Sequence, residues 1–338
     1  MPLLPDLLSN WSVAFARKRP DLAVPGSPER CLFRHVVEDA SGGLWLLEQL
    51  APGQAARREA IGQLLDGLAS RGLHGLAPYR RTASGSFVCR DWGHFWQLSH
   101  FIQGVPLVQP DFLDYAAKGA ALGGWLAALR RTSAGLPVPP GLFALDLPAY
   151  AAGLVERIGL AGESGPSGTS RAPGARPGKP EDTGNVRRDG TGLRCVHARA
   201  SALLPALAPL FEAWPHLPRA LCHGDVHPMN VIWGGDSEPA LLAVIDWEFA
   251  GVRPALYDMA NCLGCLLIEG GSPDTPFARS FLSTIRAAGL LPGDQESLLP
   301  SMILATRFGW LSEWLRRRDD EMIDLELDFM ERLAARGF

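Results

Sequence analysis

The sequence predicts an α+β fold with a small β-rich N-terminal lobe and a larger, mainly helical C-terminal lobe. The 338 residues suit two domains or lobes at about 150 residues per domain. Residues 31–102 contain short segments rich in Val, Leu, Phe and Trp that are separated by turn residues. After residue 104, apolar residues recur at helical spacing instead. Strands grouped together and followed by grouped helices are typical of α+β proteins.

The predicted β-rich lobe covers residues 25–104 and follows an N-terminal extension, residues 1–24. The expected order of elements in this lobe is strand, strand, helix, strand, strand, which makes a small antiparallel sheet with one helix. The expected elements are residues 31–38, 44–50, 55–71, 86–90 and 95–102. The Asp-Ala-Ser-Gly-Gly segment after the first strand is typical of a hairpin turn. Apolar residues recur at helical spacing within 55–71, and Gly72 ends that helix.

The predicted helical lobe covers residues 105–338. Helices are expected at residues 112–131, 148–160, 198–214 and after Pro254, with short strands at 231–233 and 241–245. Residues 161–192 are rich in Gly, Pro, Ser and mixed charges, so they cannot bury enough apolar surface to order themselves. We interpret them as a flexible insertion. A basic docking loop is the alternative, based on Arg171, Arg176, Lys179, Arg187 and Arg188.

Composition excludes several classes of protein. Hydrophobic residues make up 47% of the chain and charged residues 20%, which is close to an ordinary globular protein. The net charge of −4 supplies no broad basic face for nucleic acid or anionic lipid, so we expect neither as a partner. The start of the chain has its acidic residue before its basic ones, the reverse of a secretory signal. Six cysteines in so long a chain are no disulfide scaffold, which favours a cytoplasmic setting.

The polar residues that could carry chemistry are concentrated between residues 221 and 258. Pro228 excludes a regular helix interior, so Asp225 and Asn230 lie in an irregular loop that leads into the strand at 231–233. The next strand ends at Asp246. Two carboxylates and one amide oxygen are hard donors that suit Mg²⁺ with phosphate oxygens and water. This set predicts phosphoryl transfer, in which one Asp orients or deprotonates a hydroxyl while Asn and the second Asp hold the metal.

Alternatives to this interpretation are open at the level of single residues. Asp225 in a His-Gly-Asp turn could be only a turn former. His223, Asp225 and His227 could together ligate a transition metal, although Asn230 and Asp246 would then be unexplained. Cys262 and Cys265 form a Cys-x-x-Cys pair, which we interpret as core thiols rather than a metal or redox site.

Two short segments are similar to signatures of a known family. They are His-Gly-Asp-Val-His-Pro-Met-Asn, which ends at Asn230, and Ile-Asp-Trp-Glu, which ends at Glu248. They resemble the HGDxHxxN and IDW/F-E/D signatures of the aminoglycoside phosphotransferase/choline kinase family of small-molecule kinases. Weaker similarity extends over most of residues 25–330, including LSHFIQG and PALYD. The resemblance implies a bilobal, protein-kinase-like fold with ATP between the lobes, Mg²⁺ as the metal, and a small-molecule hydroxyl as the phosphate acceptor.

The resemblance also implies roles for individual residues. Asp225 would be the catalytic base, with His223 and His227 in the same catalytic set, and Asn230 and Asp246 would be Mg²⁺ ligands. His223 and Asp258 would brace the loop, although capping of a following helix is the alternative for Asp258. The adenine would meet backbone groups at the end of the strand predicted at 95–102, namely those of Ser99, His100, Phe101 and Ile102.

The sequence departs from the family in the nucleotide lobe. Relatives carry a phosphate-binding Lys on the strand after the first hairpin, paired with a Glu on the next helix, but here Glu48 falls at that position. Between Lys18 and Lys118 there is no Lys, so Arg57 and Arg58 beside Glu59 are the nearest candidates. The phosphate loop is reduced to Gly26 and Ser27 without a GxGxxG pattern, and a plain turn is the alternative there.

The acceptor pocket is expected near the C-terminal helices. Trp310, Glu313 and Trp314 combine aromatic faces with a carboxylate and could hold a cationic amine, with Glu248 as a further candidate on the substrate side. Two amphipathic helices with solvated charges are the alternative. We therefore expect a kinase for an amino alcohol, amino sugar or similar molecule. A nucleotide-binding pseudokinase and a nucleotidyl transferase are the competing functions.

Overall fold

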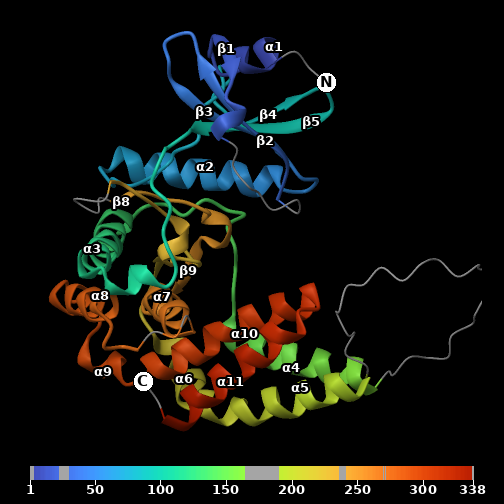
Figure 1. Cartoon of the computed structure of the whole chain (residues 1–338), viewed down its shortest axis with the longest axis vertical. Coiled ribbons are helices and arrows are strands. Elements are labelled where there is room, and N and C mark those ends of the chain that lie inside the picture. The colour runs from blue at the N-terminus through green and yellow to red at the C-terminus, as the bar shows by residue number, and fades with distance from the viewer. Residues whose placement is uncertain are drawn as a thin grey trace, which may run out of the picture. The chain divides into compact units, whose positions relative to one another are not determined.

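The computed structural model describes residues 4–22, 30–163, 190–235, 241–268, 270 and 272–336. The chain, whose helices and strands are labelled in Figure 1, divides into two compact units, each built from several segments. The first unit comprises Met1–Ala144, Arg219–Asp258 and Asp274–Leu290, and the second comprises Leu145–Pro218, Met259–Pro273 and Leu291–Phe338. The division at residues 24 and 104 that we drew from the sequence stays a prediction.

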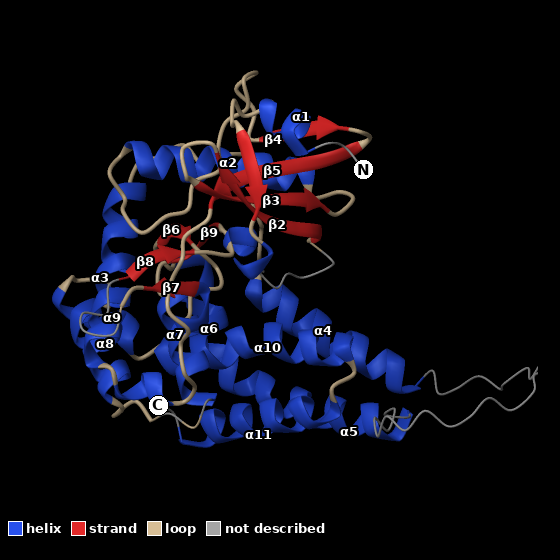
Figure 2. Ribbon diagram, turned by 45° about the horizontal axis from the view of Figure 1, so that its top comes forward, coloured by secondary structure: helices blue, strands red, loops and turns tan. Residues whose placement is uncertain are grey.

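The first unit contains a five-stranded antiparallel sheet with the strand order β1-β2-β3-β5-β4, drawn in red in Figure 2. Its strands are β1 (Phe15–Lys18), β2 (Cys31–Asp39), β3 (Leu44–Leu50), β4 (Val88–Asp91) and β5 (His94–His100). The structure therefore has the predicted strands β2 to β5 and adds β1, which the sequence analysis left in the N-terminal extension. β1 pairs with the outer edge of β2 and is mostly exposed, so its residues lack the apolar pattern of a strand.

The hairpin between β2 and β3 is held by Asp39. Its Oδ1 accepts hydrogen bonds from the backbone N–H groups of Ser41 and Gly43, both at 2.8 Å, and its Oδ2 accepts one from Trp45 Nε1 at 2.7 Å. Hydrogen bonds from the Ser41 hydroxyl, from Trp45 and from the backbone hold the pKa of Asp39 well below its usual range. This turn sets the register of the hairpin, in which Arg34 lies directly opposite Glu48.

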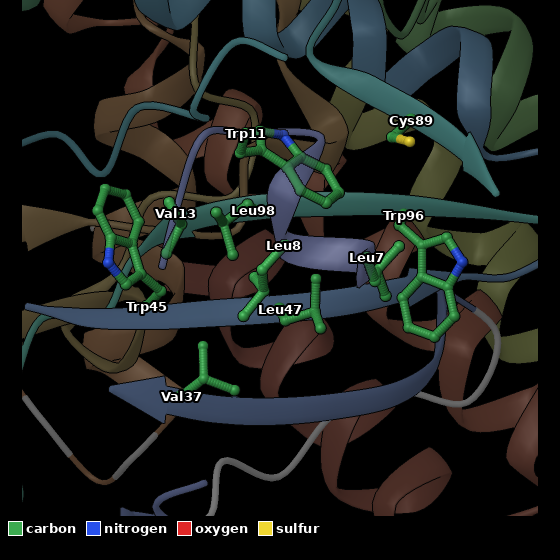
Figure 3. Packing of buried hydrophobic residues seen from close by; sticks show 10 residues of the cluster. All are labelled: Leu7, Leu8, Trp11, Val13, Val37, Trp45, Leu47, Cys89, Trp96 and Leu98. Carbon is green, nitrogen blue, oxygen red and sulfur yellow. The ribbon is translucent and has the colours of Figure 1, made fainter. Parts of the chain in front are cut away.

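The two faces of the sheet have different coverings. Helix α1 (Leu4–Ser9) and the residues just after it pack on one face, where Leu7, Leu8 and Trp11 join Trp45, Leu47 and other buried side chains (Figure 3). Because side chains alternate along a strand, Glu48 points to the opposite face. Helix α2 (Ala55–Ser70) is joined to the start of β4 through Glu59, which accepts a hydrogen bond from the backbone N–H of Phe87 at 2.8 Å.

The remainder of the first unit carries the loop that the sequence analysis singled out. Two short antiparallel pairs flank it: β6 (Arg219–Cys222) with β9 (Gly251–Pro254), and β7 (Val231–Trp233) with β8 (Leu241–Val244). Only β7 and β8 were predicted. Helices α3 (Ala116–Ser133) and α8 (Pro276–Ala287) pack closely because Gly119 has no side chain; a Cβ there would lie 2.2 Å from the carbonyl oxygen of Phe277.

The second unit is helical. It contains α4 (Leu147–Glu163), α5 (Gly190–Leu203), α6 (Ala208–Ala213), α9 (Gly293–Glu296), α10 (Leu299–Arg317), α11 (Asp320–Arg336) and the continuation of α7 (Tyr257–Ile268), which begins in the first unit. Arg199 on α5 forms ion pairs with Asp328 and Glu331 on α11. Short 3-10 helices complete the described chain: Pro20–Leu22, Asp111–Asp114, Leu204–Leu207, Trp214–His216, Pro228–Asn230 and Trp247–Phe249.

Two details of the helical expectations change. The predicted single helix at 198–214 is interrupted after Leu203, where Pro205 removes a backbone donor. The predicted insertion is shorter than 161–192, since α4 continues to Glu163 and α5 begins at Gly190; the rest of it, with both of its interpretations, lies outside the described residues. No helix among the described residues is long and apolar enough to cross a bilayer. The cytoplasmic setting stays a prediction.

Candidate active site

The carboxylate of Asp258 holds the loop between β6 and β7 in place. Its Oδ2 accepts a hydrogen bond from the backbone N–H of His223 at 2.7 Å, and its Oδ1 accepts one from Gly224 at 2.8 Å. Burial raises the pKa of Asp258, and these two N–H donors partly offset that effect. Asp258 is the second residue of α7 and not the residue before it, and its contacts favour bracing of the loop over helix capping.

Gly224 permits the tight path of this loop. Its φ of +88° lies in the left-handed region, and an added Cβ would lie 2.1 Å from the carbonyl oxygen of Phe249. Any other residue would therefore meet both backbone strain and a clash with backbone. The glycine in the His-Gly-Asp motif is required by this geometry.

The imidazole of His223 is completely enclosed and uses both ring nitrogens within the protein. Its Nδ1 accepts a hydrogen bond from the backbone N–H of Asp225 at 3.2 Å, and its Nε2 lies 2.9 Å from the carbonyl oxygen of Ile245. This pair of partners assigns the proton to Nε2. Burial lowers the pKa of His223 to about 4, so the ring is neutral at pH 7.

The alternative of a transition-metal site at His223, Asp225 and His227 is wrong. A metal ligand needs a ring nitrogen with an available lone pair, and His223 has committed both of its nitrogens. Within the part of the chain that the structure describes, no group of three or more His, Cys, Asp and Glu residues could hold a metal ion.

Asp225 and Asn230 are joined across the loop. The amide Nδ2 of Asn230 donates to the carbonyl oxygen of Asp225 at 2.8 Å and to its carboxylate Oδ2 at 3.1 Å, which turns the amide oxygen away from Asp225. His227 Nε2 lies 3.9 Å from Asp225 Oδ1. The side chain of Asp225 keeps 17% of its surface exposed, so the carboxylate is accessible to a small molecule while its position is fixed.

Asp246 is brought beside this loop by the backbone. The N–H of Ile245 donates to the carbonyl oxygen of Asn230 at 2.9 Å, which ties the end of β8 to the start of β7. Asp246 itself has a φ of +66°, an uncommon conformation for a residue with a side chain. Its two carboxylate oxygens lie 2.5 and 2.6 Å from Nη1 of Arg30, the residue before β2.

Glu248 and Arg58 form a buried ion pair next to Asp246. Arg58 Nη2 lies 2.7 Å from Glu248 Oε1, and Arg58 Nη1 donates to the hydroxyl of Tyr79 at 3.0 Å. Burial would lower the pKa of Arg58, but Tyr79, Glu48 and Glu248 outweigh it and hold the pKa above its ordinary value. Burial raises the pKa of Glu248, and Arg58 opposes that effect. Both side chains therefore contact protein groups. The predicted contacts were with the nucleotide phosphates for Arg58 and with the substrate for Glu248.

Glu48 stands on β3 at the centre of a buried polar row. Its Oε1 accepts a hydrogen bond from Arg34 Nε at 2.8 Å, and its Oε2 accepts one from Gln97 Nε2 at 3.1 Å. These residues come from β2, β3 and β5 and are directly opposite one another in the register. We call Arg34, Glu48 and Gln97 the polar row. Only 4% of Glu48 is exposed, so its charge requires the cation on β2.

Comparison with known proteins now identifies the family. The model of the phosphotransferase enzyme family matches residues 35–293, which is more than half of the chain. The chain belongs to the phosphotransferase enzyme family. This match confirms the resemblance that the His-Gly-Asp and Ile-Asp-Trp-Glu segments indicated.

Several curated proteins match parts of the chain. Homoserine kinase of Methylocella silvestris is 32% identical over 216 residues, which cover 62% of this chain and 53% of that protein. Homoserine kinase of Beijerinckia indica is 31% identical over 158 residues, 41% of this chain and 47% of that protein. Viomycin phosphotransferase of Streptomyces vinaceus is 33% identical over 117 residues, 30% of this chain and 39% of that protein. The chain thus spans about half or less of the length of these relatives.

Solved structures of kinases share the fold over nearly the whole chain. A microcompartment-associated aminopropanol kinase has a TM-score of 0.64 at 18% identity, covering 98% of this chain and 94% of that one. An aminoglycoside phosphotransferase from Alicyclobacillus acidocaldarius has a TM-score of 0.61 at 16% identity, covering 99% and 95%. These matches confirm the predicted α+β, protein-kinase-like fold with a small antiparallel sheet and a mainly helical remainder.

Within this phosphotransferase fold, the last residues of β5 and the residues just after it already have partners in the protein. Ser99 is buried and pairs with Leu46 and Tyr79, while the ring of His100 stacks on Trp45 at 3.9 Å. The N–H of Phe101 donates to the carbonyl oxygen of Leu44 at 2.9 Å. Among the described residues, the backbone of Ile102 forms no such hydrogen bond, unlike those of the other predicted adenine contacts.

Two further residues predicted to meet the nucleotide, Arg57 and Glu59, have other partners. Glu59 accepts hydrogen bonds from the backbone N–H groups of Phe87 and Val88, so it anchors α2 to β4. Arg57 lies over the ring of Phe143 at 5.4 Å. Gly26 and Ser27 lie outside the described residues.

Apart from Glu248, the predicted acceptor residues lie on α10 in the second unit. The rings of Trp310 and Trp314 stack at 5.7 Å, and Trp314 Nε1 donates to Glu326 Oε2 at 3.2 Å. The carboxylate of Glu313 is taken by Arg316 and Arg317 on the same helix, at 2.7 and 2.6 Å. These contacts favour the amphipathic-helix interpretation for Glu313.

Three arginines near the site were not predicted from the sequence. Arg30 and Arg34 contact the carboxylates of Asp246 and Glu48, and a fully buried Arg253 lies over the ring of Tyr257 at 4.7 Å. One signal for Arg34 was available. Counting outward from the hairpin turn places it opposite Glu48, so the register alone predicts the pair.

Proposed function

We propose that this chain is an ATP- and Mg²⁺-dependent phosphotransferase that moves the γ-phosphate to a hydroxyl group of a small molecule. The observation that carries the proposal is the linkage of Asp225 and Asn230 by the amide hydrogen bonds, with Asp246 brought beside them through the bond from Ile245 to Asn230. A fixed, accessible carboxylate next to two hard oxygen donors is what phosphoryl transfer requires.

In this proposal Asp225 accepts the proton of the acceptor hydroxyl. The hydroxyl oxygen forms a bond to the γ-phosphorus, the bond from that phosphorus to the β,γ-bridging oxygen breaks, and ADP leaves with the bond's electron pair. The amide of Asn230 holds the carboxylate of Asp225 in one orientation, so little reorganisation is needed. His223 positions the loop as a neutral ring and takes no proton at neutral pH.

The donor set fits Mg²⁺. The carboxylate of Asp246 and the amide oxygen of Asn230 are hard ligands, and Asp246 already attracts a cation, the guanidinium of Arg30. Asn230 and Asp246 would hold the metal, and the bound metal would neutralise charge on the nucleotide phosphates.

We infer that the acceptor carries an amine near its hydroxyl group. This inference is supported by relatives that are homoserine kinases and by a structural neighbour that is an aminopropanol kinase. A small hydroxyl compound also suits the partly exposed carboxylate of Asp225. No nucleic acid or membrane partner enters this proposal.

A second candidate function is nucleotide binding without transfer. It is favoured by the contact of Arg30 with Asp246, since this guanidinium occupies the carboxylate that the metal would need, and by Glu48 on β3 in place of Lys. A protein of this kind would bind a nucleotide and regulate a partner.

The test is phosphorylation of a panel of amino alcohols and aminoglycosides with Mg-ATP, followed by release of ADP. We expect product from at least one acceptor, and Asp225→Asn to lower turnover about 10²- to 10⁴-fold while nucleotide affinity changes little. Asp66→Asn, at an acid exposed on α2, is the matched control and should retain full turnover.

Each outcome separates the candidates. Full turnover in Asp225→Asn would overturn its role as the base. Binding of Mg-ATP without any phosphorylated acceptor would favour the regulatory protein. Release of pyrophosphate in place of ADP would indicate nucleotidyl transfer on the same scaffold.

A further inference from the structure

Arg253 is a fully buried arginine next to the loop that carries Asp225. It lies on β9, where Val252 is exposed and the alternation of side chains turns Arg253 into the protein. Within the part of the chain that the structure describes, its three guanidinium nitrogens form no hydrogen bond. Burying a charged group in this way costs free energy unless another charge compensates it. The position of Arg253 therefore needs an explanation beyond packing.

Two aromatic rings hold the guanidinium of Arg253. Its central carbon lies 4.7 Å from the centre of the Tyr257 ring and 5.5 Å from the centre of the Phe143 ring. The face of an aromatic ring attracts a cation without accepting a directed hydrogen bond from each N–H group. Because ring faces take the place of hydrogen-bond acceptors here, Arg253 supplies its surroundings mainly with positive charge.

Arg253 and Asp258 meet at Gly224, the residue before Asp225. Asp258 Oδ1 accepts a hydrogen bond from the backbone N–H of Gly224 at 2.8 Å. An added Cβ on the same glycine would lie 2.3 Å from Arg253 Nη1, so the guanidinium packs against Gly224. The carboxylate that holds the loop and a buried cation thus contact one residue, and the next residue along the chain is the proposed base.

The charge state of Asp258 depends on the groups that surround it. The ionisable side chains that face it are Arg253 on β9, Arg130 on α3, Cys222 on β6, Tyr257 on α7 and His223 in the loop. Burial raises the pKa of the Cys222 thiol and of the Tyr257 hydroxyl, so both are neutral at pH 7. Burial also raises the pKa of Asp258, and Arg253 and Arg130 oppose that effect together with the two N–H donors.

We infer that Arg253 is a positioning residue of the active site: its buried positive charge keeps Asp258 in the carboxylate form that holds the backbone of the loop, so that Asp225 stays in place. The inference rests on the proposed function and deepens it, because it names a residue on which the position of the proposed base depends. The side chain of Arg253 is completely buried, so it acts through Asp258 and not by touching a substrate.

The test compares variants that remove or keep the charge at position 253. Arg253→Met and Arg253→Gln are both neutral, so one remains if the other fails to fold, whereas Arg253→Lys keeps the charge. Arg90→Met is the matched control, because Arg90 also lies on a strand and over an aromatic ring, that of Phe95, but is exposed. The turnover number and the KM for Mg-ATP are measured on the full chain from about pH 6 to about pH 9. Hydrogen exchange gives the protection factors of the His223 and Gly224 amides over the same range.

The neutral variants should lose activity most strongly at low pH. At about pH 6 we expect kcat to fall about 10- to 100-fold while the KM for Mg-ATP stays within about threefold, since removal of a nearby cation favours the protonated form of a carboxyl group. Near pH 9 the loss should shrink to about threefold or less, because the carboxyl group then ionises without the cation. Arg253→Lys and Arg90→Met should stay within about threefold of wild type throughout. Protection of the two amides should fall and recover with pH in the same variants.

Three results would overturn the inference. They are a loss of kcat in the neutral variants that is the same at every pH, an equal loss in Arg253→Lys, and full turnover with unchanged amide protection in the neutral variants. Wild type that phosphorylates no acceptor would refute the proposed function, whereas the protection factors would still test the role of Arg253 because they require no activity. A melting curve for each variant establishes that the measured protein is folded.

Discussion

The guanidinium of Arg30 bridges both carboxylate oxygens of Asp246, although the two residues are 216 positions apart in the chain. In the proposed function, a divalent cation at Asp246 would have to displace this guanidinium, so Arg30 would compete with the metal when no nucleotide is present. The pair is partly exposed, which limits its strength to about 1 kcal/mol.

Arg30→Ala should therefore bind Mn²⁺ about three- to tenfold more tightly than wild type in the absence of nucleotide. Electron paramagnetic resonance of free Mn²⁺ measures this directly. Adding Asp246→Asn to the variant should abolish the gain. An affinity for Mn²⁺ that is unchanged or weaker in Arg30→Ala would contradict the competition.

Replacement of Gly224 by Ala should destabilise the protein more than replacement of Gly85 by Ala. Both glycines have strongly positive φ, +88° and +92°, but only at Gly224 would the new Cβ meet backbone, 2.1 Å from the oxygen of Phe249. We expect about 1–2 kcal/mol for Gly85→Ala from backbone strain alone and at least about 3 kcal/mol for Gly224→Ala. Urea unfolding of both variants measures the difference. Equal losses would mean that the loop can move away from Phe249.

Acid should destabilise the fold through His223. Its pKa is about 4 when folded and about 6.5 when unfolded, so the unfolded state binds the proton first as the pH falls. The stabilisation is complete above about pH 6.5 and is lost between pH 6.5 and 4, by on the order of 3 kcal/mol. Unfolding free energies measured across this range should decline in wild type.

The free energy of unfolding of His223→Gln should fall less steeply with falling pH than that of wild type. His216→Gln, at an exposed histidine, should show the same slope as wild type. Asp258 has a raised pKa, so its protonation stabilises the folded state as the pH falls. Because both variants retain Asp258, the comparison between them removes its effect. The same slope in both variants would show that His223 is protonated in the folded state as readily as in the unfolded one.

In the second unit, replacing one partner of the ion pair between Arg307 and Glu326 should lower the free energy of unfolding strongly, whereas replacing both partners should lower it little. Both side chains are buried, with Arg307 Nε and Nη2 each 2.6 Å from a carboxylate oxygen. Arg307→Met leaves an unpaired buried carboxylate and should cost about 3–5 kcal/mol, whereas Arg307→Met with Glu326→Leu should recover most of that loss. Arg316→Met, at an exposed pair, should change stability by less than about 0.5 kcal/mol. Thermal unfolding of the three variants tests the pattern; a double variant as unstable as Arg307→Met would refute it.

Local signals allowed much of this fold to be predicted from the sequence. The hairpin turn is specified by Asp39 and the glycines after it, and helix α2 by its apolar spacing, so both were found with nearly the observed bounds. The loop from His223 to Asn230 was found for the same reason, because the residues that shape it are neighbours in the chain.

The elements that were missed depend on distant partners. β6 pairs with β9, about thirty residues away, and neither strand has an apolar pattern of its own. The partner of Asp246 is 216 residues away, and the partner of Glu248 is Arg58, on a helix in another part of the sequence. Residue type identified these carboxylates, but only the fold determines which cation each of them meets.

The polar row has a consequence for how this chain can change. Arg34, Glu48 and Gln97 occupy one rung of the sheet, so a substitution at one position alters the charge that the other two must accommodate. Lys at position 48 alone would set two cations directly opposite each other. Positions 34 and 48 must therefore change together if a Lys is to stand on β3 without a like-charged neighbour on β2.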